Sequence, residues 1–362
     1  EAEYEFVTIP GAGRSADYTG IDVSGKIVLV SRGSTTFEEK VQVAGSKGAA
    51  GIIIYNNVAG DIKMTVGDAK LAVCSISQDE GEMLAAVGTG KLKISRGQTS
   101  GPFMSDFSSW GPSPDLEIKP EITAHGGNIL SAIPGGDYDK LSGTSMAAPN
   151  MCGIAVLIRQ YVIEKYPEYS TTQVRDLVNQ LCMSTATIAL DHKGNPYSPR
   201  KQGAGIADIV KATTIGAYLY VENAAGKDTG KTKLELGDDP TRSGSYTMTV
   251  NLKNISDASV SYRVGNIVMT ESVSASEPEY VAEMARMLAA SSEYSVEGGS
   301  FDGTTVTVEA GKVAKITVTI TLSAEDKSYL NQNFANGMYV EGYLTFDNAD
   351  ADGVDLNAPF LG

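Results

Sequence analysis

Residues 141–149 read Leu-Ser-Gly-Thr-Ser-Met-Ala-Ala-Pro, and an apolar segment that predicts a long helix, 151–161, follows at once. Gly143 predicts a tight turn that presents Ser145 at the start of this helix. A serine in that position has two interpretations. It can be an N-cap, whose oxygen accepts a hydrogen bond from a free backbone N–H group. It can also be a nucleophile, with the same N–H groups and the helix dipole stabilising an oxyanion.

The apolar residues after Ser145 cover more than one face of the helix, which predicts a helix buried in a core. Pro149 is expected in its first turn, where a missing N–H group costs least. Because proline cannot donate, the carbonyl of Ser145 loses its helical partner. A second helix is predicted from Ser170, which has Gln173 three residues later as in a capping box.

The composition indicates a globular protein of two or three domains, since the chain has 362 residues and 42% of them are hydrophobic. Its net charge of −15 disfavours nucleic acid and anionic membranes as partners. No run of 18 apolar residues occurs, so no membrane span is predicted. Both ends read as cuts within a longer protein. Cys74, Cys152 and Cys182 lie in apolar contexts without metal-ligand spacing, which predicts buried free thiols.

The first hundred residues predict a small α/β module. Apolar strands are expected at 26–30 and 51–57 with a helix at 37–46 between them, and such a unit has parallel strands. Further strands are expected at 72–76 and 91–95, with a helix at 78–87. The segments GKIVLVSRG, GAAGIIIYNN and AVCSISQDEGEML resemble the protease-associated (PA) domain over residues 10–95. In its families this module shapes substrate access or binds partners.

Four segments of the middle region occur in a characteristic order. They are FSSWGPS, IKPEITAHGGNILSA, LSGTSMAAPNMCGIAVLI and QGAGIADIVKA. The third holds the G-T-S-M-A-x-P pattern, and together they resemble the C-terminal half of a subtilisin-like serine protease domain. Residues 122–124 are expected to form a short strand, and 202–208 a glycine turn before a short helix.

Residues 216–362 alternate between apolar and polar positions, most clearly at 246–252, 316–322 and 339–346. This pattern predicts a β-sandwich, with a helix at 280–290 inserted in one connection. The region resembles a fibronectin type III-like domain. The predicted fold is therefore multidomain: a PA domain (1–100), half of a parallel α/β subtilisin-like domain (101–215) and an all-β sandwich (216–362). This order is similar to the cell-envelope proteinase branch of the subtilases in Gram-positive bacteria.

The resemblance implies that Ser145 is the nucleophile of a peptidase. It would form an acyl-enzyme with a peptide carbonyl, and its own N–H group would contribute to the oxyanion hole. Thr144 either adds a hydroxyl contact there or is simply a turn residue. By the same resemblance the protein is secreted or attached to the cell wall. No cofactor is required for this chemistry. Calcium is common among subtilases, but no site for it is evident.

The partners of the nucleophile are missing from the sequence. Subtilases carry the catalytic residues in the order Asp, His, Ser. His125 stands where the family has proline, and His192 follows the nucleophile in an exposed loop. Asp228-Thr-Gly230 has the letters of the family's aspartate motif, but it lies well after Ser145 and predicts a polar turn. The oxyanion asparagine is also expected to precede this chain.

The isolated chain is therefore predicted to be inactive, because an unassisted serine hydroxyl is a poor nucleophile. Half of a catalytic domain should expose an apolar face. We expect this face to be covered by the missing half, in the same protein or another chain, or by self-association or a rearranged middle segment. The alternative is a non-catalytic protein-binding module that retains the serine motif. A PA domain beside a metallopeptidase is disfavoured, since no metal-ligand spacing occurs.

Overall fold

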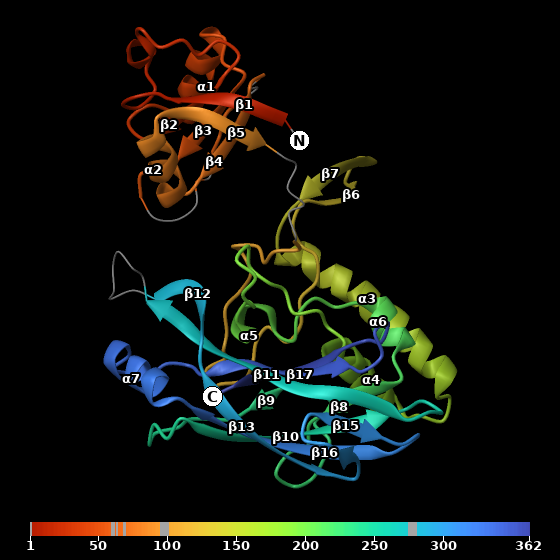
Figure 1. Ribbon diagram of the computed structural model, residues 1–362. Coiled ribbons are helices and arrows are strands. Elements are labelled where there is room, and N and C mark those ends of the chain that lie inside the picture. The colour runs from red at the N-terminus through yellow and green to blue at the C-terminus, as the bar shows by residue number, and fades with distance from the viewer. Residues whose placement is uncertain (1, 59–61, 63, 68–69, 95–100, 274–280) are drawn as a thin grey trace. The chain divides into compact units, whose positions relative to one another are not determined.

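The chain divides into two compact units, residues 1–99 and 100–362, which have separate hydrophobic cores (Figure 1). The computed structural model describes residues 2–58, 62, 64–67, 70–94, 101–273 and 281–362.

The first unit is a five-stranded sheet in the order β4-β3-β2-β1-β5. Its first four strands are parallel neighbours, and β5 is antiparallel to β1. The elements are β1 (Ala2–Thr8), a 3-10 turn η1 (Ser15–Tyr18), β2 (Ile27–Ser31), α1 (Phe37–Ser46), β3 (Gly51–Tyr55), β4 (Ala72–Ile76), α2 (Gln78–Val87) and β5 (Thr89–Ile94).

Apolar side chains on both faces of this sheet explain why β2 and β3 read as continuous apolar runs. On one face, Val28 and Ile52 pack with Val41 of α1. On the other face, Leu29 and Ile53 pack with residues of α2. Helix α2 lies so close to β3 that a Cβ atom at Gly81 would be 2.0 Å from that of Tyr55. The predicted helices and the parallel pairing of β2 with β3 are confirmed.

The second unit contains a β-sandwich. One sheet has the order β13-β16-β10-β8, and the other has the order β14-β15-β11-β17-β18-β9 with β12 also paired to β11. The strands are β8 (Ala217–Tyr220), β9 (Leu234–Glu235), β10 (Ser245–Asn254), β11 (Val260–Val273), β12 (Val281–Met287), β13 (Ala290–Glu297), β14 (Ser300–Phe301), β15 (Thr305–Val308), β16 (Val313–Leu322), β17 (Glu341–Asn348) and β18 (Leu356–Leu361).

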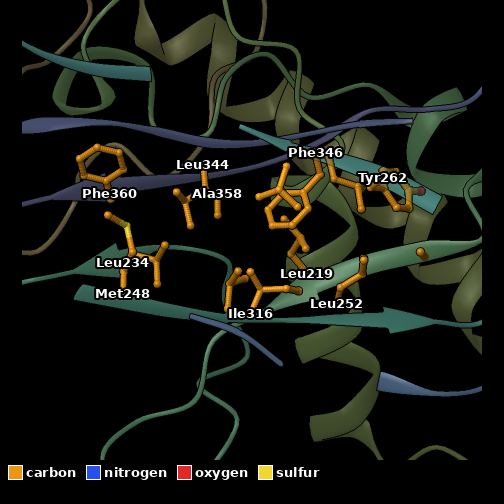
Figure 2. Packing of buried hydrophobic residues seen from close by; sticks show 14 of the residues in the cluster. Leu219, Leu234, Met248, Leu252, Tyr262, Ile316, Leu344, Phe346, Ala358 and Phe360 are labelled. Atoms are coloured by element: carbon orange, nitrogen blue, oxygen red, sulfur yellow. The ribbon is translucent and has the colours of Figure 1, made fainter. Parts of the chain in front are cut away.

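The core of the sandwich lies between the two sheets. Figure 2 shows Phe360, Leu344 and Phe346 of one sheet facing Met248 and Ile316 of the other. The alternation read from residues 246–252 and 316–322 places every second side chain in this core.

The remaining elements of the second unit precede the sandwich, except for α7. They are β6 (Ile129–Ile133), β7 (Asp137–Leu141), α3 (Thr144–Lys165), α4 (Thr171–Ser184), α5 (Pro199–Gln202), α6 (Ile209–Thr214) and α7 (Ala324–Asn333). Ser170 and Gln173 form the predicted capping box of α4. The apolar stripe of α4 is buried in the same cluster as the sandwich core, so the helices and the sheets share one core.

The prediction of a helix at 280–290 is wrong for residues 281–290, which are the part of that range that the structure describes. Residues 281–287 form β12, antiparallel to the long strand β11. A single isolated helix of this length is marginal in water, whereas the free edge of β11 offers a ladder of backbone hydrogen bonds. Tertiary pairing therefore decides the conformation.

The prediction that the helix after Ser145 is buried is also wrong for this chain. Only Ile158 and Val162 of α3 are buried, while Val156 and Leu157 are 63% and 51% exposed. Pro149 lies inside the helix rather than in its first turn, because α3 already begins at Thr144. By length and composition α3 could cross a membrane, with a mean hydropathy of 1.3 and 11% of that window buried.

Two smaller expectations also differ from the structure. The strand expected at 122–124 is a single parallel bridge from Thr123 to Ile206. All three cysteines are free as predicted, but only Cys182 is buried. Cys74 is exposed because β4 is an edge strand, and Cys152 is exposed because it lies on α3.

Phe346→Ala should destabilise the second unit by about 3–5 kcal/mol, because it removes a fully buried ring between the two sheets. Chemical denaturation followed by circular dichroism measures the change. Glu293→Ala, on the exposed side of β13, is the control and should change the unfolding free energy by less than about 0.5 kcal/mol. Equal effects of the two substitutions would contradict the packing described above.

Candidate active site

The serine turn connects β7 to α3. Gly143 precedes the first residue of α3 and has φ 155° and ψ 166°, a conformation that residues with a side chain rarely adopt. Its N–H group donates to the carbonyl of Gly126 at 2.9 Å. A Cβ atom at Gly126 would lie only 2.7 Å from the carbonyl oxygen of Gly143. The two glycines thus let two backbone segments approach closely, and this contact fixes where α3 begins.

Ser145 is the second residue of α3, and it is exposed. The capping position belongs to Gly143, and no side chain caps this helix end. In the described part of the chain the Ser145 hydroxyl makes no hydrogen bond. The N-cap interpretation of Ser145 is therefore wrong. The N–H groups of Met146 and Ala147 both donate to the carbonyl of Gly143, at 3.0 and 3.3 Å. At this end of the helix the N–H groups of Thr144 and Ser145 can therefore donate to an anion.

A cavity of about 480 Å³ lies beside the start of α3. Thr144 and Met151 of the helix line it, together with Phe103, Phe107 and His125 from the preceding segments. Apolar residues make up most of the lining, and polar side chains such as those of Ser105, Ser108 and Thr123 make up much of the rest. Thr144 is exposed at the helix start, where its hydroxyl could reach a group bound in the cavity.

The histidines and Asp228 do not form a catalytic arrangement with Ser145 in the described residues. His125 lines the cavity, but no hydrogen bond joins it to Ser145. His192 is exposed in a turn. Asp228 accepts from Gln180 Nε2 at 2.8 and 2.9 Å and from the N–H of Gly230 at 2.8 Å, so it holds a turn as the sequence indicated. Among these described residues no group of three or more His, Cys, Asp or Glu side chains could hold a metal ion.

A charged cluster that sequence reasoning missed supports the segment leading to Gly126. The carboxylate of Glu121 lies within 3.1 Å of the ammonium groups of Lys119, Lys231 and Lys233. Burial alone would raise the pKa of Glu121, but hydrogen bonds from these lysines lower it to about 2. Two of the lysines are far from Glu121 in the sequence, and no local pattern connects them.

The comparisons with known proteins agree with this architecture. Residues 2–84 match the PA domain, and residues 238–361 match the Fn3-like domain. The C5a peptidase of Streptococcus pyogenes serotype M3 is 31% identical over 350 residues, which cover 94% of this chain and 28% of that protein. The PII-type proteinase of Lactococcus lactis subsp. cremoris is 32% identical over 375 residues, which cover 97% of this chain and 18% of that protein.

These relatives confirm the predicted resemblance to the cell-envelope proteinases of the subtilase class, as well as the multidomain combination of an α/β module with a β-sandwich. The chain spans less than a third of the length of the two relatives. Among solved structures, an aminopeptidase from Aneurinibacillus sp. strain AM-1 matches 25% of this chain and 26% of its own, at 32% identity. Its TM-score of 0.23 is too low to define a shared fold.

Glu121→Gln should lower the unfolding free energy of the second unit by about 1–3 kcal/mol at pH 7, because Lys233 is nearly buried and loses a partner. The carboxylate has a folded-state pKa of about 2 against an ordinary value of 4.5. Its stabilising contribution is therefore complete above pH 4.5 and is lost as the pH falls toward 2.

Urea unfolding from pH 7 to pH 2 measures this contribution, and the difference between variant and unmutated chain should shrink across that range. Glu117→Gln is the control, since Glu117 is 45% exposed and contacts only Lys233 of the same cluster. A difference that stays constant down to pH 2 would contradict the assignment.

Proposed function

We propose that this chain is the serine-bearing part of a subtilisin-like serine endopeptidase, with Ser145 as its nucleophile. The observation that carries the proposal is the exposed Ser145 hydroxyl at the start of α3, without a capping bond. The peptidase and proteinase relatives support the same reaction class. The larger protein would be extracellular, either secreted or attached to the cell wall.

In the proposed reaction the Ser145 oxygen attacks the carbonyl carbon of a peptide bond. The C–N bond then breaks, the amine leaves with a proton, and an acyl-enzyme remains for hydrolysis by water. The developing oxyanion would accept a hydrogen bond from the Ser145 N–H group, reinforced by the helix dipole. Thr144 would add a contact through its hydroxyl. None of these steps requires a cofactor.

We further propose that the general base, its orienting aspartate and the oxyanion asparagine come from a part of the protein outside this chain. A general base must lie within hydrogen-bond reach of the serine, about 2.6–3.2 Å. His125 makes no such bond. The exposed residues of α3, together with the cavity beside it, give this missing half an apolar surface on which to pack.

Pure chain incubated with a fluorophosphonate probe should show no labelling of Ser145, whereas a longer protein containing the preceding half should be labelled. Ser145→Ala in the longer protein is the control and should abolish both labelling and peptide hydrolysis. Labelling of the isolated chain would contradict the missing base. A longer protein that is neither labelled nor active would instead favour the non-catalytic binding module.

The isolated chain should also bind a hydrophobic dye and self-associate in light scattering, because α3 leaves apolar side chains in water. Substituting both Val156 and Leu157 with serine should reduce dye fluorescence severalfold. The matched control replaces Arg159 and Gln160, which are exposed polar residues of the same helix, and should leave dye fluorescence unchanged. A monomer that binds no dye would contradict the uncovered face.

A further inference from the structure

A buried ion pair links the segment before the sandwich to the sandwich itself. Arg200 of α5 donates to Glu341 of β17 through Nε and Nη2, both at 3.0 Å. Arg200 is 5% exposed and Glu341 is 1% exposed. A second carboxylate, that of Glu271 on β11, lies 3.2 Å from Arg200 Nη2. We call Arg200, Glu341 and Glu271 the arginine clamp. Two parallel hydrogen bonds fix orientation as well as distance.

Several further contacts hold the same segment at fixed points. Ser198 donates its hydroxyl to Glu341 at 2.8 Å. The buried Tyr343 hydroxyl lies 2.9 Å from the carbonyl of Tyr197 and 3.3 Å from that of Gly203. The guanidinium of Arg200 also lies over the ring of Tyr339, 4.4 Å from its centre, and over that of Trp110, at 5.4 Å. The sandwich therefore determines the position of residues 197–203.

Residues 202–205 in turn hold the segment that leads to the serine turn. Thr123 donates its N–H to Gly205 at 2.9 Å and its hydroxyl to the carbonyl of Gln202 at 2.9 Å. Ala204 donates to the carbonyl of Glu121 at 3.0 Å. Gly203 approaches this segment so closely that a Cβ atom there would lie 2.2 Å from the carbonyl carbon of Glu121. Neither segment can shift without moving the other.

The last link joins Thr123 to Ser145 over a short stretch of backbone. Three residues after Thr123, Gly126 accepts the hydrogen bond from Gly143, which is two residues before Ser145. A Cβ atom at Gly126 would also lie 3.0 Å from the Cβ of Ala147 in the first turns of α3. The path from the clamp to the serine thus consists of backbone hydrogen bonds and close contacts at glycines.

We propose that Arg200, Glu341 and Tyr343 are positioning residues for Ser145, and that the Fn3-like sandwich sets the position of the nucleophile through them. The part of this inference that concerns catalysis rests on the proposed function. Contacts that fix the position of Ser145 matter for catalysis because a displacement of about 1 Å in a reacting group can lower the rate about 100-fold. A rigid path from a folded sandwich limits such displacement in a turn that is otherwise exposed.

Backbone amide exchange in this chain tests the proposal without any peptidase activity. Tyr343→Phe removes one hydroxyl and keeps the ring, and it should increase exchange at the Gly143 N–H at least tenfold. Glu341→Gln should increase it further, because it breaks the clamp. Amides of the first unit are the internal reference and should not change. Exchange at Gly143 that stays within twofold in both variants would overturn the proposal, and a Glu341→Gln chain that does not fold leaves Tyr343→Phe as the deciding variant.

A matched control separates positioning from general loss of stability. Val308→Ala destabilises the sandwich core far from the clamp, because Val308 pairs with Val260 at the start of β11 whereas Glu341 pairs with Met269 near its other end. It should leave exchange at Gly143 within twofold. An equal increase in this control would overturn the proposal. In the longer protein, Tyr343→Phe should lower kcat at least tenfold with less than a twofold change in KM. An unmutated longer protein without activity would refute the proposed function alone, since the exchange results do not depend on it.

Discussion

One continuous hydrophobic core joins the helix that carries the serine, and the helix packed against it, to the β-sandwich. Leu181 of α4 and Ile158 of α3 belong to the same buried cluster as Ile316 and Phe360 of the sandwich. The helices near the candidate site therefore have no separate core on which to fold, and their positions follow from the packing of the two sheets. Because burial is the dominant favourable term in folding, the sandwich determines where α3 lies. The arginine clamp and the Glu121 cluster fix the orientation of segments whose packing on the sandwich is stabilised mainly by the burial of apolar side chains.

The sequence predicted those elements whose signals are local. The capping box at Ser170 predicted the start of a helix, and α4 begins there. The apolar runs at 26–30 and 51–57 predicted two parallel strands, which the structure has as β2 and β3. By contrast, residues 281–287 pair with β11, a partner that their own sequence does not specify. The apolar composition of α3 was correctly recognised, but its exposure depends on which atoms cover it, and composition does not contain that information.

For the candidate site, too, the sequence predicted only the features that have a local signal. The position of Ser145 at the start of a helix follows from Gly143 and the apolar run after it. Whether its hydroxyl caps the helix could not be decided from the sequence, because the helix begins one residue before Ser145 rather than after it. The contacts of Glu121 and Arg200 could not be found either, since their partners come from distant parts of the chain. Long-range ion pairs depend on the folded topology.

The pairing of the first and last strands of the first unit, β1 and β5, has a consequence for how such a module can be joined to a host protein. Ala2 of β1 lies opposite Ile94 of β5, so the backbone enters and leaves the module at adjacent points of one sheet edge. The unit also has its own core on both faces of its sheet. A loop in a host domain could accept it at the entropic cost of a short connection, without its ends being pulled apart. The geometry of this strand pair therefore allows the module to be inserted between two neighbouring points of a host fold.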